Sequence, residues 1–127
     1  APEELLFSEP VELVVVPGAE GDFGVLPGHS PLISTLRTGV IAVYENDSVN
    51  RRIFVSGGFA EVTPERCTVL ADEAVALESA NRSDVEARVK TDREALESAA
   101  DDDKESAAAA LAVSEALLLA LDTAGQA

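Results

Sequence analysis

Residue types that enzymes use for proton transfer or nucleophilic attack occur close to glycines and prolines in this sequence. Asp22 and His29, the one histidine of the chain, lie in the stretch GDFGVLPGHSPL, and Cys67 is the one cysteine. A histidine can serve as a general base and a thiolate as a nucleophile. His29 has no evident partner, because Ser30 is merely adjacent and Cys67 lies in a predicted strand. We therefore predict no catalytic residues and expect His29 to serve a turn or an interface.

The same stretch resembles two nucleotide-binding patterns, and neither fits. Asp-Phe-Gly at 22–24 also occurs in protein kinases, but the other kinase motifs are absent. The neighbouring glycines lack the dinucleotide spacing, and no Gly-Lys-Ser/Thr follows them. A single cysteine and a single histidine argue against zinc. We predict no metal, no nucleotide site and no cofactor.

The formal net charge of −15 limits the partners of the chain. Phosphate backbones and anionic lipids would be repelled, so we expect no nucleic acid and favour basic protein partners. A lone cysteine allows no internal disulfide. The apolar run 107–121 is shorter than the roughly 20 residues of a membrane span, so any membrane link is expected to pass through a partner.

The elements around these residues change character near residue 79. Several stretches have the β-branched composition of strands. They are 11–16, which ends at Pro17-Gly18, then 39–45 and 49–56, which are separated by a polar turn, and finally 57–77, with a turn at 63–66. Cys67, Val69 and Ala71 are expected on one face of a strand. We predict a β-sandwich or barrel over 1–79 and an antiparallel two-helix hairpin over 80–127, a β + α fold.

The hairpin has an amphipathic first helix and an unusually apolar second helix. Ser83-x-x-Glu86 predicts the start of the first helix through a capping box, and Val85, Val89 and Leu96 share one face. The second helix is expected from about 105 to 121, with acidic residues at its start. Its apolar residues do not form one narrow stripe, so we expect packing on several sides, including against a larger partner. The residues expected to pack are Val113, Leu117, Leu118 and Leu121.

Three segments together resemble one family. They are VPGAEGDFGVLPGHSPLISTLRTGVI, then FVSGGFAEVTPERCTVLADEA, then an Ala-rich two-helix tail. Together they are similar to the epsilon subunit of bacterial F-type ATP synthase, whose mitochondrial counterpart is called delta. The resemblance implies a ten-stranded sandwich and hairpin in a non-catalytic rotor subunit of the central stalk. Such a subunit couples proton-driven rotation to ATP synthesis at the cytoplasmic face of the bacterial membrane. Because the chain starts within the stretch that follows the family's first strand, we expect that edge strand to be missing.

The resemblance also implies partners. The resemblance implies a loop of Glu20, Gly21, Asp22 and Phe23 that contacts the polar loops of the c-ring, and His29 and Ser34 match positions near gamma. The hairpin is expected to reach the catalytic beta or alpha subunits. The alternative is a free-standing β-sandwich that binds a small molecule or acts as a regulatory module.

Two departures from the family bear on the tail. Where some members bind ATP through Leu-Asp-x-x-Arg-Ala, this chain has Asp84-Val85-Glu86-Ala87-Arg88-Val89, so we expect no ATP site. The second helix has Lys104 at its start and no later basic residue, so we expect weak or absent inhibition of ATP hydrolysis by the tail.

Overall fold

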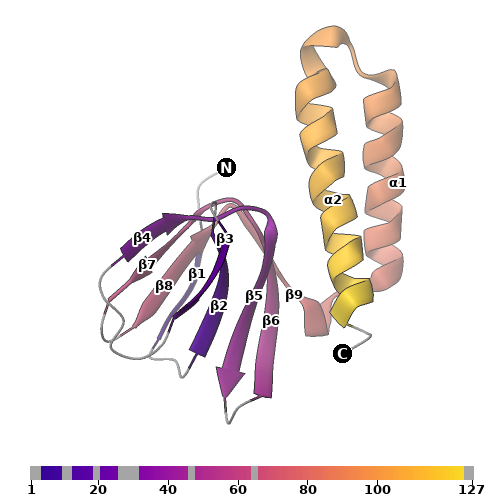
Figure 1. The fold of residues 1–127 in the computed structure, drawn as a ribbon. Coiled ribbons are helices and arrows are strands. Elements are labelled where there is room, and N and C mark those ends of the chain that lie inside the picture. The colour runs from indigo at the N-terminus through magenta and orange to yellow at the C-terminus, as the bar shows by residue number, and fades with distance from the viewer. Residues whose placement is uncertain are drawn as a thin grey trace. The chain divides into compact units, whose positions relative to one another are not determined.

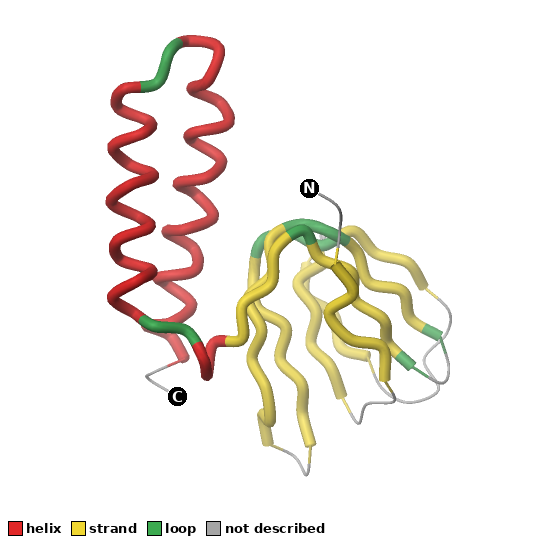
Figure 2. The backbone as a smooth tube through the Cα atoms, turned by 180° about the vertical axis from the view of Figure 1, so that it is seen from behind, coloured by secondary structure: helices red, strands yellow, loops and turns green. Residues whose placement is uncertain are grey.

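The computed structural model describes residues 4–9, 13–18, 21–25, 32–45, 48–63 and 66–124. The chain divides into two compact units, 1–78 and 79–127. The strands belong to the first unit and both long helices to the second (Figures 1 and 2).

The described part of the first unit contains nine strands in two antiparallel sheets. In one sheet, called sheet A, the order is β1 (Glu4–Glu9), β8 (Cys67–Ala71), β7 (Phe59–Val62), β4 (Leu32–Thr35). In the other, sheet B, the order is β3 (Gly21–Val25), β2 (Leu13–Gly18), β5 (Gly39–Glu45), β6 (Ser48–Ser56), β9 (Glu73–Ala76). The predicted β-sandwich followed by a helical hairpin is thus confirmed.

Small and β-branched side chains from both sheets form the core. Every second residue of β8 is buried, so Cys67, Val69 and Ala71 share the inner face as predicted. The same alternation buries Ile41 and Val43 of β5. The whole core cluster is Leu36, Ile41, Val43, Ile53, Val55, Ala60, Val62, Cys67, Val69 and Ala71.

The end of β2 differs from the prediction. We expected the strand to stop at Pro17-Gly18, but it continues to Gly18, and Pro17 pairs with Asp22 of β3. Pro17 lies beyond Val15, the last residue of β2 that pairs with β5. The missing N–H of proline therefore breaks no rung between these two strands. The expected turn at 63–66 is closed by a hydrogen bond from the Thr63 N–H to the Arg66 carbonyl, at 2.9 Å.

The segment from Leu36 to Gly39 leads from sheet A to sheet B and is bonded to both. The Leu36 N–H donates to the Gly58 carbonyl, next to β7, at 3.0 Å. The Arg37 N–H donates to the Pro17 carbonyl of β2, also at 3.0 Å. We call this segment the corner; its first side chain, Leu36, is buried in the core.

Gly57 and Gly58 connect β6 to β7 in conformations that other residues rarely adopt. Their φ angles are 75° and 99°. A Cβ on Gly58 would lie 2.1 Å from the Leu70 carbonyl oxygen, whereas one on Gly57 would lie 2.4 Å from the Asp72 side chain. The link between these strands therefore requires glycine at 58 for two independent reasons.

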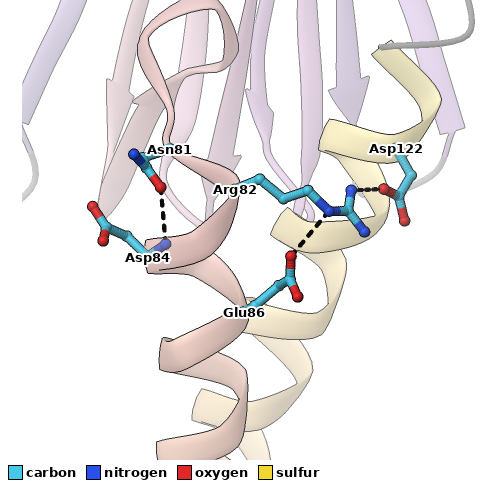
Figure 3. A network of polar contacts seen from close by, with 5 residues as sticks. All are labelled: Asn81, Arg82, Asp84, Glu86 and Asp122. Carbon is cyan, nitrogen blue, oxygen red and sulfur yellow. Dashed lines mark hydrogen bonds and ion pairs between the residues drawn. The ribbon is translucent and has the colours of Figure 1, made fainter.

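The second unit consists of α1 (Arg82–Ser98), a 3-10 turn over Asp101–Asp103, and α2 (Lys104–Ala124). The predicted capping box at Ser83 is wrong, because Ser83 lies inside α1. Asn81 is the N-cap, and its side chain accepts the Asp84 N–H at 3.1 Å (Figure 3). Asparagine and serine are equally good N-caps, so the residue types alone do not decide whether the helix begins after Asn81 or after Ser83.

The length of α2 overturns the argument used above against a membrane span. The helix has 21 residues, and the stretch Asp101–Thr123 is long and apolar enough to cross a membrane by length and composition. A packed helix of a soluble domain meets the same two criteria. Glu115 and Asp122 of α2 form ion pairs with arginines of α1.

Candidate functional site

The residues proposed to meet the c-ring lie beside the end of one β-hairpin. Gly21, Asp22 and Phe23 belong to β3, an edge strand of sheet B, rather than to a loop. Gly18 of β2 pairs with Gly21 at the end of these two strands. Glu20 itself lies outside the described residues. The pairing places Asp22 one residue from the hairpin end.

Of the two residues proposed to meet gamma, Ser34 lies on β4, an edge strand of sheet A. Ser34 is half-buried, and its hydroxyl donates to the Thr35 carbonyl at 3.1 Å. Its neighbour Ile33 is 68% exposed, which is unusual for a large apolar residue. Ile33 pairs with the exposed Glu61 of β7, which pairs with Thr68 of β8. We call Ile33, Glu61 and Thr68 the outer row of sheet A. His29 lies outside the described residues.

Cys67, considered above as a nucleophile, has no exposed surface. Burial raises the pKa of its thiol from 9.0 to about 11. A thiol that is buried and protonated is inert. Among the described residues, no three His, Cys, Asp or Glu side chains gather as metal ligands would.

This pKa shift predicts a pH dependence of stability. Below pH 9 the thiol is protonated in both states, so it contributes nothing that varies with pH. Between pH 9 and about 11 the unfolded thiol ionises and the folded one does not, so stability should fall, by roughly 2 kcal/mol over the whole interval. Urea titrations of the wild type and Cys67→Ala, followed by methyl NMR signals of the core, measure this. A difference between the two proteins that stays constant from pH 8 to 11 would contradict the prediction.

The four side chains expected to pack from the tail differ in burial. Leu117 is only 2% exposed, whereas Val113, Leu118 and Leu121 are half-buried. The one fully buried residue among the described part of α2 is polar: Ser114, whose hydroxyl donates to the Leu111 carbonyl at 3.2 Å. The sequence analysis missed it. The signal was a small residue three positions after Leu111 and four before Leu118, on the same side of the helix.

Ion pairs join the two helices at two levels. Arg82 of α1 contacts Asp122 of α2, and its Nε lies 3.1 Å from Oε1 of Glu86 on its own helix (Figure 3). Farther along, Arg93 lies 3.4 Å from Glu115. In both cross-helix pairs α1 supplies the cation and α2 the carboxylate, which agrees with the antiparallel register. All these groups are substantially exposed, so each pair adds little stability.

Arg88, which stands where the nucleotide motif of some family members has its arginine, is part of a local ion pair. Its Nε lies 3.8 Å from Oδ2 of Asp92, one turn farther along α1. A phosphate would have to compete with this carboxylate. The arrangement is consistent with the expectation of no ATP site in the tail.

The sequence matches a family of known proteins over the whole sandwich. Residues 1–77 match the family described as ATP synthase, Delta/Epsilon chain, beta-sandwich domain. The chain belongs to the ATP synthase delta/epsilon family. Full-length relatives extend the match into the helices. The chain is 57% identical over 121 residues to the ATP synthase epsilon chain of Rhodospirillum rubrum, covering 94% of this chain and 90% of that one.

A second relative and a solved structure agree. The ATP synthase epsilon chain of Paramagnetospirillum magneticum is 48% identical over 122 residues, covering 95% of this chain and 92% of that one. A chain in the mitochondrial ATP synthase of Euglena gracilis, solved as OSCP/F1/c-ring in rotational state 1, matches with a TM-score of 0.73 and 30% identity. That match covers 89% of this chain and 71% of the Euglena chain. The epsilon fold thus includes the hairpin as well as the sandwich.

Proposed function

We propose that this epsilon chain joins gamma to the c-ring and transmits rotation between them. As a member of its family it is a non-catalytic subunit of the central stalk of ATP synthase. The observation that carries the finer proposal is the outer row of sheet A, in which Ile33 and Glu61 are exposed, on a chain that resembles part of an F1/c-ring assembly. The buried, protonated Cys67 supports a role without catalysis.

The outer row of sheet A suits a protein partner. Ile33 offers exposed apolar area on a short edge strand, with Glu61 beside it and Thr68 beyond Glu61. Apolar area next to polar groups is common in protein interfaces. Ser34 follows Ile33 on β4, so the family-derived gamma contact and the exposed apolar residue share this edge strand, although their side chains point to opposite faces of the sheet.

The β2–β3 hairpin is the proposed contact with the c-ring. Asp22 and Glu20 provide negative charge near its end, which suits a basic residue in a c-ring loop. Such a contact weakens as salt rises, because exposed charges are screened beyond about 10 Å at 0.1 M. Five cross-strand pairs between β2 and β3 hold the hairpin end in place. They run from the pair Val14 and Val25 to the pair Gly18 and Gly21.

Placing the subunit in ATP synthase makes it peripherally membrane-associated, and we propose the cytoplasmic face of the bacterial membrane. The hairpin is proposed to contact the beta or alpha subunits with little inhibition of ATP hydrolysis. Lys104 supports this, since it is the one basic residue of α2 and lies 3.7 Å from Asp101. A helix with so little positive charge offers few contacts to an acidic surface.

Substitution of Ile33 by glutamate should weaken binding to purified gamma at least tenfold, because it places an unpaired charge within the proposed interface. Leu119→Glu is the matched control, since Leu119 is 65% exposed and the change adds the same charge. It should alter the affinity by less than threefold. Isothermal titration calorimetry gives both values. Equal effects of the two substitutions would contradict the assignment of the outer row, and a wild-type chain that fails to bind gamma would contradict the proposed function.

A further inference from the structure

A side chain extends the edge of sheet B beyond its last strand. β9 ends its pairing with β6 at Ala76, opposite Ile53. The preceding residue of β6, Arg52, is next in line for a partner on this side. Its N–H donates to Oε1 of Glu78 at 2.9 Å. A carboxylate thus takes the place of the backbone carbonyl that another residue of β9 would have supplied.

The same glutamate stands where the sandwich ends. The first unit of the chain finishes at Glu78, inside the 3-10 turn Leu77–Ser79. Three residues later the next attachment begins, because Asn81 caps α1 through its side chain and its carbonyl accepts the Val85 N–H at 3.1 Å. Ser79 and Ala80 lie between these two attachments.

We infer that the Glu78–Arg52 hydrogen bond restricts bending of the chain between sandwich and hairpin to Ser79 and Ala80. We call these two residues the pivot. Leu77, only 7% exposed, also holds this end of the chain. Apolar burial is non-directional, however, whereas a hydrogen bond requires defined distances and angles. The direction in which the chain leaves sheet B is therefore set by Glu78.

Amide hydrogen exchange in the full chain tests the bond directly. In Glu78→Ala, the Arg52 amide should exchange about tenfold faster, the loss expected for a hydrogen bond to a charged group. The Phe54 amide, two residues along β6 and opposite Val75 of the intact β9, should keep its wild-type rate. Ser79→Ala, a change in the same 3-10 turn, should leave both amides unchanged.

Glu78→Gln separates the hydrogen bond from the effect of charge on exchange. Glutamine keeps an acceptor oxygen and loses the charge, so Arg52 protection should lie closer to wild type than to Glu78→Ala. Equal rates in the two variants would overturn the inference, because the charge alone would then explain the change. An Arg52 rate that is unaltered in Glu78→Ala would overturn it as well.

Limited proteolysis tests the pivot. With a broad-specificity protease, cleavage between residues 77 and 81 should become several-fold faster in Glu78→Ala than in Ser79→Ala. If exchange at Arg52 became faster and cleavage did not, the hydrogen bond would be supported, but its role in restricting the pivot would be refuted.

Discussion

Replacing Gly58 with alanine should destabilise the sandwich by roughly 3 to 5 kcal/mol, enough to leave much of the protein unfolded. The φ angle of 99° strains any residue with a side chain. The new Cβ would also lie 2.1 Å from the Leu70 carbonyl oxygen and 2.7 Å from the Ala71 Cα. Both are backbone atoms of β8, so relief requires β7 and β8 to separate. Urea unfolding followed by the fluorescence of Tyr44, the one tyrosine and a residue of β5, reports on this unit.

Gly57→Ala is the matched control for this substitution. It also introduces a Cβ at positive φ, but the closest atom is the end of the exposed Asp72 side chain, which can rotate away. We expect a loss of about 1 to 2 kcal/mol, from the backbone strain alone. If the two alanine variants were equally stable, the collision with β8 would not be the cause of the larger effect.

The second large effect concerns Ser114. A leucine there should destabilise the hairpin by roughly 2 to 4 kcal/mol, because a fully buried position sized for serine has no room for a longer side chain. Ser114→Ala should change stability by less than about 0.5 kcal/mol. It removes a hydroxyl whose bond is to a carbonyl of its own helix, and alanine favours the helix.

Thermal unfolding followed by circular dichroism at 222 nm measures both Ser114 variants, since α1 and α2 supply most of that signal. Leu119→Ala serves as the control for a change of size at an exposed position of the same helix, and it should be nearly neutral. A Ser114→Leu protein as stable as wild type would show that the helices can separate at this level without cost.

Short-range patterns in the sequence were sufficient for most of the fold. The alternation around Val69 and the helical spacing of Val85 and Val89 correctly indicated which faces are buried. Hydrophobicity alone misled the analysis in α2. There Ser114 is buried and Leu119 is exposed, because burial along a helix depends on which side meets its neighbours. Such contacts are set by the antiparallel register, which brings together residues far apart in the sequence, such as Arg93 and Glu115.

The candidate site was less predictable for a related reason. Asp22 was expected in a loop, but pairing with Pro17 makes it part of a strand. Ile33 attracted no attention in the sequence, since an apolar residue in a strand is usually buried. Its exposure follows from its place on the outward face of an edge strand, which only the pairing of the strands reveals. The role of Glu78 depended equally on a residue 26 positions away.

The corner between β4 and β5 has a mechanical consequence. Apolar contacts between two layers lack direction, so they define the relative position of the layers less sharply than hydrogen bonds do. At the corner, the Leu36 N–H donates a hydrogen bond to the Gly58 carbonyl beside sheet A. The next N–H, that of Arg37, donates to the Pro17 carbonyl of sheet B. A tangential force on the outside of sheet A would therefore stretch two directional bonds before it could shear the sandwich. The corner thus ties the two sheets together at one end of the domain, which suits the proposed transmission of rotation.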